Sequence, residues 1–310
     1  MKQKGNNMAK KIFAGIIFIS LLFTGANLIG TPVSPEVAET SVQLDDPVIL
    51  NEGSLPMYIH FIDVGQGDSI FVDYGDYEIL IDAGDNSSGD KVTDYISQYI
   101  DGNLELIIAT HVHEDHIGGL DTVMNSYQID RVIDSGDAAE TATFNDYFAA
   151  IREEDCVYIA DEDMKIDIGD NAVLTIIETD DGKSNHNNNS VIAMIDYQDI
   201  EILLTGDMES PAERRHLTKF TDIDVLKAGH HGSSTASCED FLSVVKPETV
   251  IISCAEENTY QHPHKETVNR FLNIGASVYG TFMSGTIVLT TDGSTCIFNS
   301  DDHLTIEDAN

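Results

Sequence analysis

The sequence predicts an α/β protein folded as a four-layer αβ/βα sandwich, with two mixed β-sheets packed face to face and helices on both outer sides. Three observations support this fold class. Short apolar runs bounded by turns, which are typical of strands, alternate with helical stretches from Met57 onward. The second half repeats the order of the first half, strands and then alternating strands and helices. No low-complexity segment interrupts the pattern, and we expect residues 56–299 to form one domain.

The first half begins with three strands and continues with alternating elements. The strands are expected in "YIHFIDV", "SIFVDY" and "YEILIDAG", because each is a short apolar run and glycine-containing turns separate them. A helix, a strand, a helix, a strand and a helix are then expected at Lys91–Ile100, Leu104–Ala109, Ile117–Tyr127, Ile129–Ile133 and Phe144–Arg152.

The second half is expected to follow the same plan. Three strands and a helix come first, at Ala172–Ile177, Ser190–Asp196, Ile200–Leu204 and Glu209–Phe220. Two strand–helix pairs follow: "DIDVLKA" with Glu239–Lys246, and "TVIISC" with Lys265–Ile274. The chain closes with strands near Ser277–Tyr279, Gly285–Leu289 and Thr295–Phe298. Residues 300–310 read as an acidic tail.

The N-terminal segment predicts export. Residues 1–30 begin with four lysines and continue with an apolar run from Ile12 that ends near the small residues Thr24, Gly25 and Ala26, the pattern of a secretory signal peptide. The run is also long enough for an uncleaved anchor. Residues 31–55 are polar with scattered prolines and read as a linker. We therefore expect a secreted or cell-surface protein that contacts the membrane only through this segment.

Composition restricts the partners. The chain holds 16 Lys and Arg residues against 54 Asp and Glu residues, which gives a net charge of -38. A largely negative surface repels nucleic acid, since nonspecific binding to phosphate needs clustered basic residues. DNA is therefore disfavoured as a partner unless a metal supplies positive charge. The 4 cysteines lack zinc-finger spacing, and free thiols are favoured over a disulfide.

Three histidines and an aspartate crowd the segment "THVHEDHIGG", directly after an expected buried strand. Four desolvated polar groups are costly without partners, and a divalent cation supplies one. His111 and His113 alternate and can bind one ion from the same side. Asp115 and His116 lie further round the turn and can bind a second ion. Imidazole and carboxylate ligands suit Zn²⁺, Mn²⁺ or Fe²⁺ better than Ca²⁺.

Further candidate ligands follow other expected strands. Asp207 lies in "LLTGDME", where it is positioned to bridge two ions, and His230 and His231 lie in "KAGHHGSS". Asp82 ends "ILIDAG", where a carboxylate can orient a liganding imidazole. For Asp207 or Asp82 taken alone, the alternative is a structural aspartate in a turn.

Two other motifs point toward the same site. In "FIDVGQGDS" the glycines open no helix, so a phosphate loop is disfavoured and a tight turn with Gln66 and Asp68 facing the metal site is expected. In "NTYQHPHKE", His262 and His264 are candidates to hold a leaving group or act as general acid. The alternative for this pair is two solvated histidines around a proline that starts a helix.

Together these motifs resemble a known family. The combination of "FIDVGQGDSIFV", "THVHEDHIGGL", "NNNSVIAMI", "LLTGDME", "DVLKAGHHGS" and "YQHPH" is similar to the metallo-β-lactamase superfamily, and more narrowly to the metal-dependent domain of DNA-uptake competence proteins of the ComEC type. The resemblance covers Tyr58 to Phe298 in order. It implies the αβ/βα sandwich, a dinuclear site between the sheets and hydrolytic chemistry.

The resemblance also implies a role for each candidate residue. It makes His111 and His113 ligands of the first metal and Asp115 and His116 ligands of the second, with Asp115 also a candidate catalytic carboxylate. Asp207 matches the bridging carboxylate. For the last ligand the resemblance favours His230 over His231 and keeps both as candidates, and Asp82 matches the supporting aspartate.

One position departs from the superfamily pattern. Many members carry a third histidine for the first metal between Asp181 and Ser190, where the register of "NNNSV" puts Asn189 in this chain. His186, three residues earlier, is the alternative ligand. A coordination sphere completed by an oxygen would shift the preference from Zn²⁺ toward Mn²⁺.

The expected cofactors are two divalent ions, Zn or Mn, and the expected nucleophile is a metal-bound hydroxide. The first choice of substrate is a small-molecule or polymeric phosphodiester, such as DNA or a cell-surface phosphodiester like a teichoic-acid substituent. Two alternatives stay open. One is a lactone- or β-lactam-type hydrolase of the same fold, and the other is a non-catalytic binding module that keeps the metal for stability.

Overall fold

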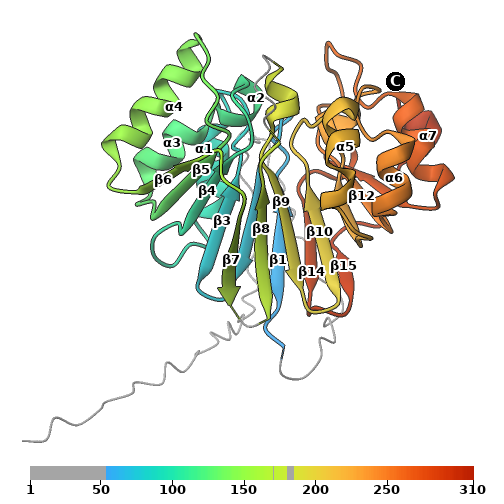
Figure 1. Cartoon of the computed structure of the whole chain (residues 1–310), viewed down its shortest axis with the longest axis horizontal. Helices are drawn as coiled ribbons and strands as arrows, with labels where there is room; N and C mark the ends of the chain where they lie inside the picture. The colour runs from blue at the N-terminus through green and yellow to red at the C-terminus, as the bar shows by residue number, and fades with distance from the viewer. Residues whose placement is uncertain (1–53, 170, 180–184) are drawn as a thin grey trace, which may run out of the picture. The chain divides into compact units, whose positions relative to one another are not determined.

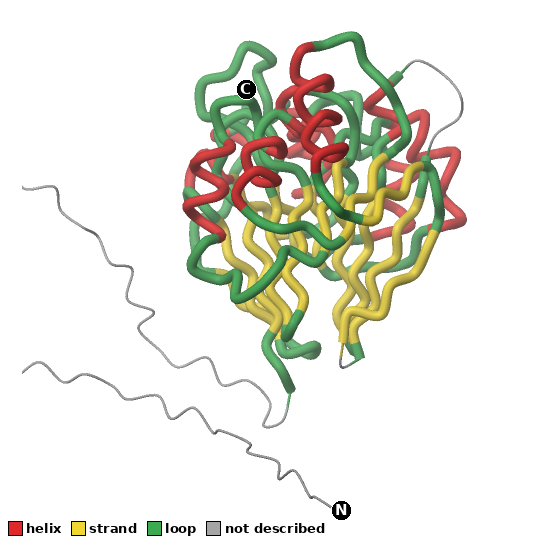
Figure 2. Tube along the Cα trace, turned by 90° about the vertical axis from the view of Figure 1, so that its left-hand side faces the viewer, coloured by secondary structure: helices red, strands yellow, loops and turns green. Residues whose placement is uncertain are grey.

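The structure of the chain is a computed structural model that describes residues 54–169, 171–179 and 185–310. The expected signal or anchor segment and nearly all of the expected linker lie outside these residues. Two β-sheets pack face to face, and helices cover the outer side of each sheet (Figures 1 and 2). This arrangement confirms the predicted four-layer αβ/βα sandwich.

The first sheet has eight strands in the order β15-β14-β1-β2-β3-β4-β5-β6. The four strands from β3 to β6 are parallel, and the other neighbours are antiparallel. Their bounds are β1 (Met57–Phe61), β2 (Ile70–Tyr74), β3 (Tyr77–Ile81), β4 (Leu106–Ala109), β5 (Arg131–Asp134), β6 (Val157–Ala160), β14 (Ile287–Thr291) and β15 (Cys296–Phe298).

The second sheet has seven strands in the order β13-β12-β11-β10-β9-β8-β7. Here β10 to β13 are parallel and β7 to β10 are antiparallel. Their bounds are β7 (Met164–Gly169), β8 (Ala172–Ile177), β9 (Ile192–Tyr197), β10 (Ile200–Leu204), β11 (Val225–Lys227), β12 (Thr249–Ile252) and β13 (Ser277–Gly280).

The helices are divided between the two outer faces (Figure 1). The first sheet is covered by α1 (Gly89–Ile96), α2 (Glu114–Ile117), α3 (Leu120–Ser126) and α4 (Ala142–Glu153). The second sheet is covered by α5 (Ser210–His216), α6 (Glu239–Val245) and α7 (Lys265–Asn273), and α8 (Thr281–Ser284) follows β13. Short 3₁₀ turns are η1 (His186–Asn189), η2 (Leu217–Lys219), η3 (Gly229–Gly232) and η4 (Ile306–Asp308). Within the described ranges no helix is long and apolar enough to cross a membrane.

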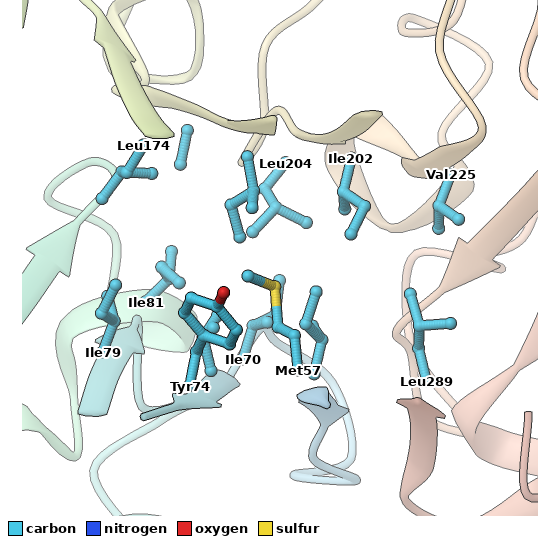
Figure 3. Packing of buried hydrophobic residues seen from close by; sticks show 14 of the residues in the cluster. Met57, Ile70, Tyr74, Ile79, Ile81, Leu174, Ile202, Leu204, Val225 and Leu289 are labelled. Atoms are coloured by element: carbon cyan, nitrogen blue, oxygen red, sulfur yellow. The ribbon is translucent and has the colours of Figure 1, made fainter. Parts of the chain in front are cut away.

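A continuous apolar core fills the space between the sheets. Figure 3 shows Ile79 and Ile81 of the first sheet facing Leu174 and Leu204 of the second, all of them fully or almost fully buried. Leu80 points the other way and packs under the helices, because successive side chains on a strand face opposite sides. Burying one such side chain contributes about 1.5–3 kcal/mol. The core holds the two sheets in place against each other and therefore positions the loops at their edges.

Three features differ from the expected elements. The edge strands β6 and β7 are additional strands, and β6 exposes Val157 and Tyr158 instead of alternating toward a core. The strands β14 and β15 leave the second half and join the first sheet beside β1. The helix expected at Ile117–Tyr127 is split at Gly118 and Gly119, where a Cβ would meet backbone atoms of the β3–α1 loop at 2.3–2.4 Å.

The C-terminal residues also pack closely on the domain instead of extending as a tail. Leu304 is buried, and its N–H donates to the carbonyl of Val278 at 2.7 Å. The N–H of Asn310 donates to Pro263, and the Asn310 carbonyl accepts from Lys265, both at 3.0 Å. All four cysteines are free thiols.

Candidate metal centre

Polar loops from both sheets meet at one edge of the sandwich, near α2 at the top of Figure 1. Asp82 follows β3, the segment from Thr110 to His116 follows β4, Asp207 follows β10, and His231 follows β11. These loops all leave the carboxyl ends of parallel strands, where open α/β sheets place their ligand sites. The topology therefore gathers side chains that are far apart in the sequence.

Two groups of side chains have the spacing that a metal ion requires. The first group is His111, His113 and Asp207, and the second group is Asp115, His116 and His231. In each group one ligand atom of every residue lies within 4.8 Å of the others. His111, His116, Asp207 and His231 are almost completely buried.

Asp207 joins the two groups. Its Oδ2 lies 3.7 Å from Nε2 of His111 in the first group. Its Oδ1 lies 3.3 Å from Nε2 of His116 and 3.4 Å from Nε2 of His231 in the second group. This is the position of a carboxylate that can bridge two ions.

The tautomers of the second group leave nitrogen lone pairs facing each other. His116 Nδ1 lies 2.7 Å from Asp82 Oδ2, and His231 Nδ1 lies 3.0 Å from the Ser253 carbonyl. Because both partners are acceptors, both Nδ1 atoms carry hydrogen, so in the neutral rings the two Nε2 atoms, 3.3 Å apart, present lone pairs. Lone pairs of two imidazoles and one carboxylate converge, so this donor set fits a divalent cation.

Asp82 lies behind His116 and contacts the loop that follows β4. Its carboxylate accepts the Thr110 N–H at 2.8 Å and the Thr110 hydroxyl at 2.7 Å in addition to its contact with His116. The side chain is fully buried. A carboxylate held this firmly fixes both the tautomer and the ring plane of the liganding histidine.

The structure places His231, and not the favoured His230, in the second group. His230 is partly exposed, its Nδ1 lies 3.3 Å from Glu209 Oε1, and its Nε2 is 3.7 Å from Asp207 Oδ2. His231 instead reaches within 3.3 Å of Asp115 Oδ2. Both histidines have positive φ, 49° and 54°, so the backbone of η3 winds in the left-handed sense and turns the second ring into the site.

The pKa values of two histidines indicate that the second group requires positive charge. Burial would lower the pKa of His231, but Asp207 and Asp68 outweigh burial and raise it to about 10. Burial is likewise outweighed at His116, where Asp207 and Asp82 raise the pKa well above its usual value. Without metal, protons therefore neutralise the carboxylates, and a bound cation would replace those protons.

His186 and Asn189 lie beside the first group but outside both groups. Nδ1 of His186 is 2.7 Å from Asp137 Oδ2, and the Asn189 amide donates to the same oxygen at 3.0 Å. The His186 ring centroid is 5.8 Å from that of His113. Asp137, which the sequence did not single out, therefore anchors the loop next to His113.

A pocket of about 320 Å³ opens onto the two groups. His262 lines it, with its ring 5.4 Å from that of His230. His264 is not among the lining residues and instead accepts the Ser234 N–H at 2.8 Å. The exposed Tyr260 ring stacks on His262 at 5.6 Å. The lining residues are Gln66, His113, Glu114, Asp115, Asn187, Asp207, His230, His231, Tyr260 and His262.

Comparison with protein families agrees with this geometry. Residues 62–256 match the model of the Metallo-beta-lactamase superfamily, and the chain belongs to this superfamily. Proteins of this superfamily use divalent metals, and the two groups are the candidate ligands here. The superfamily predicted from the sequence motifs is therefore confirmed.

Several curated bacterial proteins, including Competence protein ComA of Neisseria gonorrhoeae, are similar to most of this chain. The chain is 30% identical to ComE operon protein 3 of Bacillus subtilis over 78% of this chain and 33% of that protein. It is 28% identical to Recombination protein 2 of Haemophilus influenzae over 73% of this chain and 28% of the relative. The chain thus spans about a third of the length of these curated relatives.

Among solved structures, the metallo-beta-lactamase fold protein YhfI from Bacillus subtilis aligns with a TM-score of 0.51 and 13% identity. The alignment covers 76% of this chain and 99% of that one. At this identity the likeness shows the fold alone. The superfamily match and the two groups of candidate ligands support metal-dependent hydrolysis as the class of chemistry.

Proposed function

We propose that this domain is a metal-dependent phosphodiesterase with a dinuclear site for Zn²⁺ or Mn²⁺. The observation that carries the proposal is the pair of His/Asp groups joined by Asp207 at the floor of one pocket. The first group would hold one ion and the second group the other. When bound, such cations lower the pKa of coordinated water and neutralise charge that develops on a phosphoryl oxygen.

The chain's own residues prepare the site in three ways. Asp82 and the Ser253 carbonyl hold protons on the Nδ1 atoms of His116 and His231, which keeps both Nε2 atoms available as ligands. The side chains of His111, His116 and His231 are almost completely buried, which limits contact with water on the side away from the pocket. His262, at the pocket wall, is positioned to contact the leaving group.

The relatives and the net charge of the chain both restrict the class of substrate. The similarity to competence proteins favours a phosphodiester over a β-lactam, and it includes DNA as a candidate. The net charge of -38 disfavours long polyanions unless cations occupy the site. A small or cell-surface phosphodiester meets both constraints.

A substrate screen at defined metal content tests the proposal. Purified protein loaded with Zn²⁺ or Mn²⁺ is assayed with a chromogenic bis-phosphodiester, a lactone and a cephalosporin, with Asp207→Asn as the control. We expect metal-dependent release of chromophore from the phosphodiester only. Turnover of the lactone or the cephalosporin alone would assign the alternative hydrolase, and metal binding without turnover of any of the three would assign a binding module.

We also propose that the protein is exported, on the basis of its lysine-rich start and the apolar run that follows. Cell fractionation with an antibody against the domain tests this localisation. We expect the protein outside the cytoplasm, either free or attached to the membrane. Full-length chain recovered soluble from the cytoplasm would contradict export.

A further inference from the structure

A buried ion pair lies directly behind the metal-binding groups. Nζ of Lys227, at the end of β11, is 2.8 Å from Asp68 Oδ2 and donates to the Ala228 carbonyl at 3.0 Å. Lys227 is 0% exposed and Asp68 is 1% exposed. Neither residue lines the pocket, so the pair has no direct route to a substrate.

Asp68 connects three of the loops that carry ligands. Its N–H donates to the carbonyl of Asp115 at 3.2 Å, and its carbonyl accepts the N–H of Gly84 at 2.8 Å. Its second carboxylate oxygen, Oδ1, lies 3.3 Å from Nδ1 of His231. The preceding Gly67 lies so close to Asp115 that a Cβ would sit 2.3 Å from the Asp115 carbonyl oxygen.

We propose that Asp68 and Lys227 are a positioning pair that orients His231 and so holds the second group ready to bind its metal. This inference rests on the metal site of the proposed function, but not on any substrate, because metal binding is its readout.

Stability alone does not account for this pair. Two charges removed from water are often no better for stability than an apolar pair of the same size. The Lys227 ammonium group lies 2.8 Å from Asp68 Oδ2, and both side chains are buried, so the carboxylate is held at a fixed position. Asp68 Oδ1 lies 3.3 Å from the same Nδ1 that faces the Ser253 carbonyl, and together the two oxygens hold the ring so that Nε2 faces Asp115 and Asp207.

Lys227 has a second consequence for Asp68. The Asp68 carboxylate lies close enough to His231 and Asp207 to form a third metal-binding combination with them. The Lys227 ammonium group occupies Oδ2 of that carboxylate. Asp68 therefore stays behind His231 and does not compete with Asp115 for the ion.

Asp68→Asn tests the side chain alone, because the two backbone hydrogen bonds of residue 68 remain. Metal affinity is measured by Co²⁺ titration against a competing chelator, and metal content by elemental analysis. We expect the second ion to bind about 10–100-fold more weakly, the range found when a residue behind a metal ligand is removed. The ion of the first group is the internal reference and keeps its affinity to within a few-fold.

The double variant Asp68→Asn/Lys227→Met separates positioning from folding, since it leaves no buried charge unpaired. We expect its metal-free melting temperature to equal or exceed that of Asp68→Asn, while its second ion binds as weakly as in the single variant. Glu78→Gln, which changes a buried carboxylate at the opposite end of β3, serves as the matched control and keeps both affinities.

Several outcomes would overturn the proposal. One is wild-type affinity for both ions in Asp68→Asn or in the double variant. Equal weakening of both ions would indicate a general disturbance of the site. If the double variant failed to fold, the pair would be required for folding and would not act specifically on His231. The experiment measures metal binding and not hydrolysis. Loss of the second ion therefore supports the positioning role of Asp68 and Lys227 even if no phosphodiester is cleaved.

Discussion

Adjacent histidines with different environments give the sharpest test of the site. His231→Ala removes a buried nitrogen that lies 3.3 Å from Asp115 Oδ2 and 3.4 Å from Asp207 Oδ1. Removing a residue that only supports a ligand costs 10–100-fold in metal affinity, so loss of the ligand itself should exceed about 100-fold. A factor of 100 is about 2.8 kcal/mol of binding free energy. We expect one ion per chain to be lost, together with most of the hydrolytic activity.

The matched variant is His230→Ala, which changes the neighbouring residue of the same turn. His230 contacts Glu209 through Nδ1, and its Nε2 is farther from Asp207 than that of His231. We expect two ions to remain and metal affinity to change less than tenfold. Elemental analysis after gel filtration and a chelator competition give both numbers. The reasoning is refuted if His230→Ala loses an ion while His231→Ala keeps two.

Four further predictions follow from the same geometry. His113→Ala and Asp207→Asn should each abolish hydrolysis, and normal rates in either variant with verified metal content would place the site elsewhere. His186→Ala should keep both ions and lower the free energy of unfolding by at most ~1 kcal/mol in chemical denaturation, since its ion pair with Asp137 is partly exposed; loss of one ion per chain would make it a ligand. Metal affinity should rise at least about tenfold per pH unit between pH 7 and 9. The pKa of His231 is raised to about 10, so metal binding displaces a proton from its ring. A metal affinity that stays constant with pH in chelator competition would contradict this. Removing the ions with EDTA should lower the melting temperature, because ligands of the folded state stabilise it; an unchanged temperature would mean that no ion was bound.

The fold was largely predictable because its central strands are short and mostly apolar. The strands Ala172–Ile177 and Ile200–Leu204 begin and end where the sequence places them, since each is buried and bounded by turn residues. Edge strands lack this signal, and Val157 in β6 is 56% exposed. The pairing of β14 with β1 joins segments more than 200 residues apart, and no local pattern contains that information.

The candidate site was predictable to the extent that its residues follow strands. Local motifs identified His111, Asp207 and Asp82, because strand ends meet at one edge of the sheets. The choice between His230 and His231 depends on two positive φ angles, which the residue types do not indicate. The partners Asp68 and Lys227 are separated by 159 positions, and only folding brings them together.

Charge links the metal site to the order of binding. The lining of the pocket includes Glu114, Asp115 and Asp207 and no lysine or arginine from the described part of the chain. The nearby Lys227 ammonium is already paired with Asp68. Bound cations would therefore supply the positive charge that the pocket lining lacks, and we expect an anionic substrate to bind after the metal.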